Sequence, residues 1–238
     1  MAQRAESSFV GLLRRNPAIS IALDDPFLVL LVKGIGVGSL LLVIALLLPL
    51  SAGALVPVLY LYGAIPFALL MVHIFRRQRI EGLGSGNISV SNAFRTGGLA
   101  AGGLAVAGEV SKSLLPLFLS WYWFGFDVAV SAGLLFCCIL GEYVSPFLLG
   151  RGGFAGTIMI WSFAILAPIP MLLAISCMLL VLLLTKDTFL MIMTAFWTLP
   201  LLLLLLQAGL PLVLLALGYA ILFSLRISRE RNDFTYGR

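Results

Sequence analysis

The chain has 238 residues, of which 61% are hydrophobic and only 11% are charged, with a formal net charge of +5 at pH 7. Soluble domains carry roughly 25% charged residues, so this composition excludes an ordinary soluble globule and a disordered chain. Runs such as 27–49 and 199–223 approach or exceed the ~20 apolar residues that span a bilayer. We therefore predict an all-α, polytopic membrane helix bundle.

The apolar segments follow one another along the chain at about 28–50, 53–75, 98–126, 128–149 and 154–226. The last stretch is interrupted by Pro168 and Pro170, and again by Lys186-Asp187. Because a proline removes a backbone donor and disfavours the α conformation of the residue before it, we predict a helix break at 167–170. The break also places the basic tail on the same side as the basic loop 76–97, in agreement with the positive-inside bias. The pattern predicts about eight membrane segments with both termini cytosolic.

The distribution of charge argues for a membrane protein with a site open to the cytosol. Lys and Arg lie beside apolar segments rather than along one soluble face, which indicates topology signals and anion ligands and excludes a nucleic-acid partner. The three cysteines lie in apolar runs without metal-ligand spacing, so neither a metal nor a cofactor is expected. Asp127 alone is expected to face outward.

The loop after the second segment is rich in groups that bind anions. Glycines flank a serine in Gly84-Ser85-Gly86-Asn87, and Asn92 and Arg95 follow. Successive backbone N–H groups in such a loop converge on an anion, and an arginine adds a bidentate charge for phosphate or carboxylate. A phosphate cradle and a flexible loop whose arginines only set topology explain this composition equally well.

Two carboxylates stand out in apolar surroundings. Glu109 and Lys112 share one helix face at spacing i, i+3, and each would be costly unpaired within a bilayer, so we expect them to pair. That pair is either a functional site or a structural bridge that closes the bundle. Glu142 precedes Arg151 near a membrane boundary and is either part of a structural ion pair or a partly desolvated general base toward a hydroxyl.

Four segments have the order and spacing of motifs in one family of bacterial membrane enzymes. They are 63–67 (G-A-I-P-F for G-S-I-P-F), 84–95 (G-S-G-N, then N and R, for G-S-G-N-x-G-A-T-N-x-x-R), 109–116 (E-V-S-K, then P, for D-x-x-K-G-x-x-P) and 140–153 (L-G through G-G for L-G-H-x-x-P through G-G-K-G). With them the chain, from about residue 54 onward, resembles the bacterial acyl-phosphate:glycerol-3-phosphate acyltransferases.

The resemblance implies a bundle of about seven helices with its motifs on the cytosolic side, preceded here by one extra helix. The expected division is a cytosolic segment 1–26, the extra helix 27–52, an acyltransferase-like domain 53–226 and a cytosolic tail 227–238. The implied reaction transfers a fatty acyl group from acyl phosphate to glycerol 3-phosphate at the inner membrane, as a step of phospholipid biosynthesis.

The resemblance also suggests roles for residues of this chain. Those expected to act in catalysis are Ser85, Arg95 and Glu142. Those expected to bind substrate or phosphate are Gly84, Gly86, Asn87, Asn92, Lys112, Arg151, Gly152 and Gly153. Acyl phosphate, glycerol 3-phosphate and membrane lipids are the expected partners, and the extra helix offers a place for a protein partner.

The chain departs from the family pattern in its second motif. Glu142 stands in place of the histidine, Ser145 in place of the proline and Phe154 in place of the lysine of G-G-K-G. The C-terminal H-R-x-N pattern is reduced to the residues 228–232. These changes favour a second interpretation, a non-catalytic homologue that keeps the fold and binds a lipid or a protein complex.

Overall fold

The structure is a computed structural model that describes residues 26–227. All but the last residue of the expected cytosolic segment 1–26, and the pattern at 228–232, lie outside the described residues. The helices are α3 (Pro26–Leu47), α4 (Leu50–Gly53), α5 (Val56–Gly63), α6 (Phe67–Arg76), α7 (Val90–Phe124), α8 (Val128–Tyr143), α9 (Gly156–Leu166), α10 (Pro168–Thr185), α11 (Thr188–Leu205) and α12 (Leu210–Ile227), with short 3₁₀ helices η1 (Ile80–Gly82) and η2 (Pro146–Leu148).

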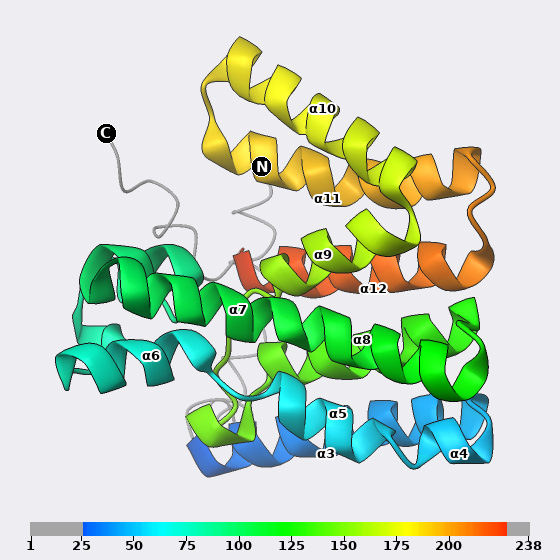
Figure 1. The fold of residues 1–238 in the computed structure, drawn as a ribbon, viewed down its shortest axis with the longest axis horizontal. Coiled ribbons are helices and arrows are strands. Elements are labelled where there is room, and N and C mark those ends of the chain that lie inside the picture. Colours follow the sequence, from blue (N-terminus) through cyan, green and yellow to red (C-terminus); the bar gives the residue numbers. More distant parts are fainter. Residues whose placement is uncertain (1–25, 228–238) are drawn as a thin grey trace, which may run out of the picture.

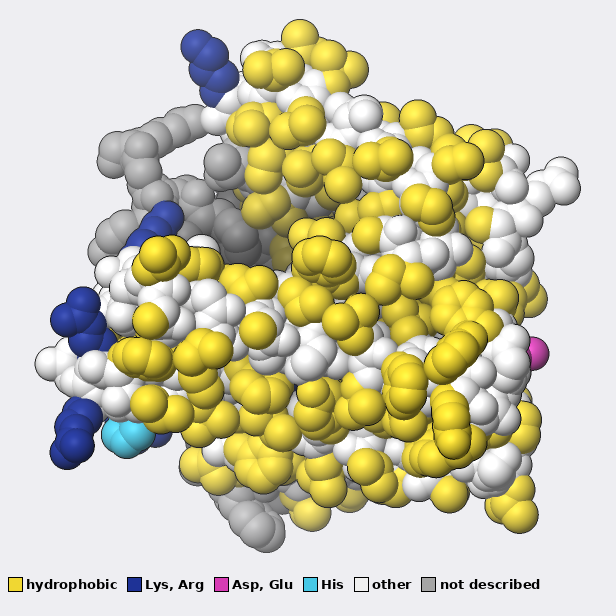
Figure 2. All heavy atoms as spheres, viewed as in Figure 1, with side chains coloured by type: hydrophobic (Ala, Val, Ile, Leu, Met, Phe, Trp, Pro, Cys, Tyr) yellow, Lys and Arg dark blue, Asp and Glu magenta, His cyan; other side chains and the backbone are white. Residues whose placement is uncertain are grey.

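The described part of the chain is an all-helical bundle, which confirms the predicted fold class. Four stretches are long and apolar enough to cross a membrane, namely Val29–Leu47, Leu50–Arg76, Val90–Phe124 and Pro168–Thr185. Four shorter apolar helices complete the set at Val128–Tyr143, Gly156–Leu166, Phe189–Leu205 and Leu210–Arg226. Apolar side chains cover most of the face in Figure 2, whereas Lys and Arg gather toward one end of it.

The helices lie side by side in successive layers (Figure 1). The long helix α7 and its neighbour α8 form the central tier, with α5 packed on α8 and α6 packed on α7 on one side. On the other side α9 contacts α7 and α12 contacts α8, and the hairpin of α10 and α11 packs outside them. This order brings the middle of α7, with Glu109 and Lys112, against the last turn of α8, with Glu142.

The predicted break at 167–170 is confirmed, because α9 ends at Leu166 and α10 begins at Pro168. The predicted segment 53–75 is divided, since α5 ends at Gly63 and Pro66 separates it from α6. The predicted segment 128–149 ends early, at Tyr143.

Local chemistry explains where α8 ends and where α7 begins. Pro146 keeps the preceding Ser145 extended, with φ −79° and ψ 123°, so α8 cannot continue through it. Helix α7 begins eight residues before residue 98, where the apolar segment was predicted to start. The Ser89 side chain caps the helix by accepting a hydrogen bond from the Asn92 N–H. A kink at Gly98, with φ 83°, then separates this added turn from the predicted span.

Glycines allow α5 and α8 to pack backbone against backbone. A Cβ at Gly63 would lie 2.2 Å from the carbonyl oxygen of Cys138, and a Cβ at Gly141 would lie 2.0 Å from that of Tyr60. Contacts this short admit no side chain, which is how small residues bring membrane helices together. Ser145 then donates from its hydroxyl to the Ala64 carbonyl at 2.7 Å, next to the break before α6.

The extra helix predicted at 27–52 is present as α3, followed by the short α4. Only 6% of its apolar span is buried inside the protein, compared with 33% and 39% for the next two spans. It packs on α4, α5 and α8, and the Lys33 ammonium donates to the Gly150 carbonyl at 3.3 Å. Helix α3 is therefore held loosely and leaves most of its apolar surface to lipid.

Candidate functional site

Three buried ionisable side chains meet where α7 and α8 cross. The Lys112 ammonium lies 3.0 Å from the carboxylate of Glu109, one turn away on α7, and also hydrogen-bonds to a carboxylate oxygen of Glu142 on α8. Lys112 is fully buried, while Glu109 and Glu142 are 6% and 7% exposed. The pairing of Glu109 with Lys112 was predicted. Glu142, which lies 30 residues after Lys112 in the sequence, also bonds to the same ammonium group.

The aromatic ring of Phe67 closes this cluster from the side of α6. Lys112 Nζ lies 5.3 Å from the Phe67 ring centroid, a cation–π distance. Two carboxylates and one ring thus surround a single buried ammonium. Such a charge is tolerated within a bundle only with close partners, because an isolated ion in a low-dielectric interior is costly.

The loop after α8 wraps around Glu142. The Gly153 N–H donates to the Glu142 carbonyl at 2.9 Å, and the Ser145 N–H donates to the Arg151 carbonyl at 3.0 Å. A Cβ at Gly153 would lie 1.8 Å from Glu142 Oε1. The diglycine Gly152-Gly153 is therefore a backbone wall against the carboxylate, and a larger residue at 153 would displace it.

A cavity of about 480 Å³ opens beside the two carboxylates. Its lining includes both Glu109 and Glu142, hydroxyls from the start of α7 and of α9, and apolar groups. The residues that line it are Ala68, Ile88, Ser89, Val90, Ser91, Phe94, Glu109, Glu142, Phe154, Ala155, Gly156, Thr157 and Ile160. We call this space the carboxylate cavity.

A second cavity, of about 360 Å³, lies between α9, α10, α11 and α12. The two cavities share Phe154, Gly156 and Ile160 in their linings. Apart from these residues the second lining is Met159, Met171, Ala174, Ile175, Met178, Ile192, Ala195, Phe196, Leu199 and Phe223. A cavity that contains two carboxylates thus adjoins a cavity lined by apolar side chains.

The glycine-rich loop is organised by one buried amide. Asn92 donates to the carbonyls of Leu83 and Asn87 at 3.0 and 2.9 Å, and its Oδ1 accepts from the Ser85 N–H at 3.3 Å. Gly84 and Gly86 have φ values of 57° and 74°, in the region that favours glycine. The Asn92 side chain, predicted as a phosphate ligand, is thus engaged in holding the loop that carries Ser85.

The two arginines predicted to belong to the site, Arg95 and Arg151, do not line the carboxylate cavity. Arg95 is exposed and is not among the described residues that line the carboxylate cavity. Arg151 is exposed as well and lines a different cavity, beside Lys33. Of the predicted ligands, Glu142 and Lys112 come together, whereas Arg95 and Arg151 remain apart from them.

Arg226 was not expected to belong to the site. Its guanidinium donates to the carbonyls of Gly152 and of Gly153, the latter at 2.8 Å, and lies 4.8 Å from the Phe154 ring centroid. In the sequence it is a basic residue in the last turn of an apolar helix, which by itself indicates only topology. Its role depends on α12 packing against α8, which no local pattern encodes.

Comparison with known proteins connects this arrangement to one family. The model of the family described as glycerol-3-phosphate acyltransferase matches residues 53–234, more than half of the chain. The chain belongs to the glycerol-3-phosphate acyltransferase family. The match begins after α3, so the loosely packed helix precedes the family domain.

Individual relatives are similar over part of their length. A glycerol-3-phosphate acyltransferase of a Bradyrhizobium species is 40% identical over 96 residues, which are 40% of this chain and 46% of the relative. One of a Jannaschia species is 34% identical over 105 residues, which are 42% of this chain and 51% of the relative. The matched parts span about half the length of these two relatives.

The fold is that of a solved membrane enzyme. The crystal structure of PlsY, an integral membrane glycerol 3-phosphate acyltransferase in its glycerol 3-phosphate form, superposes with a TM-score of 0.67 at 23% identity. The superposition covers 79% of this chain and 94% of that one. This likeness shows that the superposed part of the chain has the same fold.

Proposed function

We propose that the protein transfers a fatty acyl group from an acyl phosphate to glycerol 3-phosphate, forming lysophosphatidic acid for phospholipid synthesis. The observation that carries the proposal is that the carboxylate cavity and the apolar cavity share Phe154, Gly156 and Ile160 in their linings. An acyl donor is polar at its reacting end and apolar along its chain, so it matches two adjacent cavities of which one is lined by carboxylates and the other by apolar side chains.

In this proposal Glu142 acts as the general base. The acceptor hydroxyl attacks the acyl carbonyl carbon, a new C–O ester bond forms, and the bond between that carbon and the phosphate oxygen breaks. The hydroxyl proton passes to the Glu142 carboxylate, and inorganic phosphate leaves with the bonding electrons. Because the donor is already activated, positioning and charge neutralisation supply most of the catalysis without a covalent enzyme intermediate.

Lys112 orients the base and balances its charge. It bonds to both carboxylates, so that the cluster carries two negative charges and one positive charge when all three groups are ionised. The cation keeps Glu142 in place at the cavity wall, and its field reaches the anionic substrates in the same low-dielectric space.

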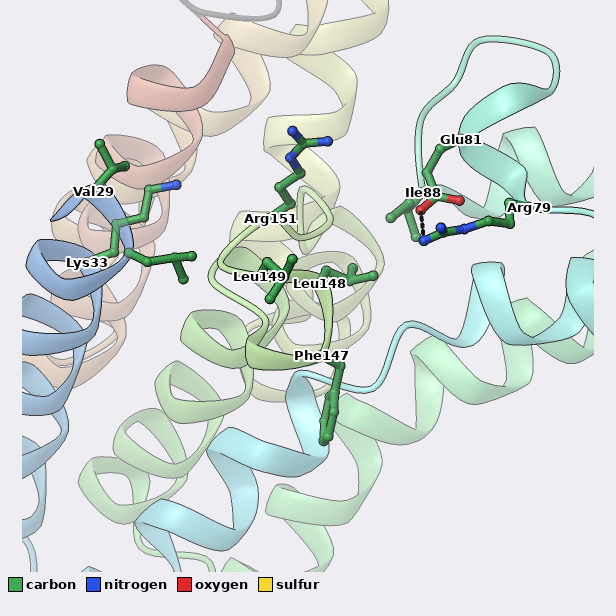
Figure 3. Close-up of a pocket in the computed structure, with 10 residues that line it drawn as sticks. Val29, Lys33, Arg79, Glu81, Ile88, Phe147, Leu148, Leu149 and Arg151 are labelled. Atoms are coloured by element: carbon green, nitrogen blue, oxygen red, sulfur yellow. Dashed lines mark hydrogen bonds and ion pairs between the residues drawn. The ribbon is translucent and has the colours of Figure 1, made fainter. Parts of the chain in front are cut away.

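The glycine-rich loop is the proposed phosphate cradle, with Ser85, Gly86 and Asn87 as its contacting groups. Arg95 supports it from the exposed surface as a charge that attracts anions. The carbonyls of Gly152 and Gly153 are held by Arg226, which supplies a cation next to Phe154, the residue in the place of the family lysine. Arg151 takes no part in the proposed reaction because it lines a different cavity, next to Lys33 (Figure 3).

The proposed location is the inner membrane with the site facing the cytosol. Lys and Arg gather at one end of the face shown in Figure 2, which matches a cytosolic side by the positive-inside bias. A protein partner for α3 stays a prediction.

The role of the carboxylate is tested by acyl transfer with the purified full chain in mild detergent, with acyl phosphate and radiolabelled glycerol 3-phosphate. The Glu142→Gln variant keeps the shape and a hydrogen bond to Lys112 but cannot accept a proton as a carboxylate does. We expect it to lower the rate of labelled product at least about 100-fold, the usual contribution of a general base.

The matched control is Asp127→Asn, another carboxylate-to-amide change. Asp127 caps α8 at the end opposite Glu142, accepting from the Val130 N–H at 2.8 Å, and asparagine is an equally good cap. Its rate should equal that of the wild type. Equal rates for Glu142→Gln and the wild type would overturn the assignment of Glu142 as the base.

A further inference from the structure

The apolar cavity begins beside the proposed reaction site and ends inside the packed bundle. At its near end it shares Phe154, Gly156 and Ile160 with the carboxylate cavity. At its far end the lining includes Met171 and Leu199, which are 9% and 4% exposed and belong to a cluster of buried apolar side chains. We call these two residues the floor of the cavity.

The order of residues along the helices gives the depth of the cavity. Gly156 begins α9, whereas Met171 lies near the start of α10, just after the turn that joins these two helices. The lining on α10 extends from Met178 to Met171, and the lining on α11 extends from Ile192 to Leu199. Each of these stretches covers about 10 Å along its helix axis. Two neighbouring helices (Figure 1) thus give the same depth.

Burial of the lining increases toward the floor. Ile160 is 50% exposed at the near end, and Met178 and Ile192 are partly exposed. Ala174, one turn after Met171 on α10, is only 2% exposed. Because packed side chains leave no space for another group, an apolar chain can enter from the exposed end and is stopped at the buried one.

The cavity is shorter than the acyl chains that fill a bilayer. The hydrocarbon core is about 30 Å thick, so the chains of one leaflet span about 15 Å. The cavity extends about 10 Å along its helices. A chain as long as a leaflet therefore meets the floor before it is fully enclosed. It must then displace Met171, the more adaptable of the two floor side chains, or leave part of its length outside.

We propose that Met171 and Leu199 limit the length of the acyl chain that the protein binds and transfers, so that chains shorter than a leaflet are preferred. This inference rests on the proposed acyl transfer and specifies the donors for it. The chain lies in the apolar cavity, with its carbonyl carbon in the carboxylate cavity and its last methyl group against Met171. Each methylene enclosed by the cavity strengthens binding about fourfold, whereas a methylene beyond the floor adds nothing.

The test measures binding separately from transfer. Alkyl phosphates from octyl to hexadecyl phosphate have the chain and the charge of the donor but no acyl group, so they cannot react. Their affinity for the purified full chain in mild detergent is obtained from the rise of the unfolding midpoint with ligand concentration. We expect the wild-type affinity to increase as far as dodecyl phosphate and then to stay level. Met171→Ala opens space at the floor and should raise the ratio of hexadecyl to decyl phosphate affinity about tenfold.

Ala174→Val makes the opposite change, because it adds side-chain volume beside the floor, and it should lower the same ratio by a similar factor. A general loosening of the bundle would move the ratio in one direction for both variants. Ala174→Val alone tests the proposal if Met171→Ala does not fold. The matched control is Met191→Ala, at a partly buried methionine of α11 that is not among the described residues lining the cavity, and it should leave the ratio unchanged.

Acyl transfer from decanoyl and palmitoyl phosphate to radiolabelled glycerol 3-phosphate is measured on the same proteins. Opposite shifts of the affinity ratio in Met171→Ala and Ala174→Val support the proposal. If these shifts occur but no variant and no wild-type sample forms labelled product, the proposed acyl transfer is wrong and the floor still limits chain length. An unchanged ratio in both variants, an equal shift in Met191→Ala, or a wild-type affinity that rises steadily to hexadecyl phosphate would overturn the proposal.

Discussion

Lys112 and Glu142 hydrogen-bond to each other across the crossing of α7 and α8, although they lie 30 residues apart in the sequence. The contact is almost fully buried, and Glu109 binds the same ammonium from the other side at 3.0 Å. It joins the segments around Glu109 and Glu142 into one charged centre at the wall of a cavity. The stability of the bundle and the proposed chemistry therefore depend on the same three side chains.

Replacing Lys112 should destabilise the protein strongly. Lys112→Met removes the cation that two buried carboxylates share, and breaking a buried ion pair from one side costs about 3–5 kcal/mol. We expect a lower free energy of unfolding in detergent, measured by denaturation of the purified protein. Adding Glu142→Gln should recover part of the loss, and a single variant as stable as the wild type would show that the carboxylates do not need the cation.

Gly141→Ala tests the close contact of α5 and α8. The added Cβ would lie 2.0 Å from the Tyr60 carbonyl, so one of the helices must move. We expect a loss of at least about 1–3 kcal/mol, as for other overpacked contacts. Gly103→Ala is the matched control because a Cβ there meets nothing within 4 Å. The measurement is the midpoint temperature of thermal unfolding of both variants. Similar midpoints for the two would contradict the close packing of α5 against α8 at Gly141.

Asn92→Asp should loosen the glycine-rich loop. The change keeps an acceptor for the Ser85 N–H but removes the donors to Leu83 and Asn87. We expect faster hydrogen–deuterium exchange across 83–89 and a higher apparent KM for glycerol 3-phosphate. Gln78→Ala, at an exposed amide before the loop, is the control and should change neither. Unchanged exchange in Asn92→Asp would show that the amide does not hold the loop.

Arg226→Ala should disturb the loop beside Glu142. The guanidinium donates to the carbonyls of Gly152 and Gly153, and bonds from a charged donor contribute about 1.5–3 kcal/mol each. We expect acyl transfer to fall about tenfold or more, with Arg226→Lys intermediate because an ammonium lacks the planar fork of arginine. Arg76→Ala, at the exposed end of α6, should leave the rate unchanged. If Arg226→Ala transfers acyl groups at the wild-type rate, Arg226 does not contribute to the reaction.

The features that the sequence predicted correctly are encoded locally. The prolines at 168 and 170 end one helix and begin the next by their own geometry, and the spacing of Glu109 and Lys112 places both on one helix face. The apolar segment predicted at 53–75 lies within one candidate span, Leu50–Arg76, and Pro66 divides it into α5 and α6.

The remaining parts of the site arise from packing between distant helices. Glu142 was expected either to pair with Arg151 or to act alone, whereas its partner is Lys112. Arg226 reaches Gly152 and Gly153 from a helix more than 70 residues later. Contacts of this kind depend on which helices become neighbours, and neither hydropathy nor spacing specifies that for a chain read alone.

The most direct test of the account is acyl transfer by the wild-type full chain in lipid, with acyl phosphate and radiolabelled glycerol 3-phosphate as substrates. A second protein, carrying Glu142→His and Phe154→Lys, restores the two family residues and serves as the comparison. We expect labelled lysophosphatidic acid from the wild type at a rate that depends on acyl phosphate. Product from the restored variant alone would contradict it and would identify the natural chain as a non-catalytic member of the family.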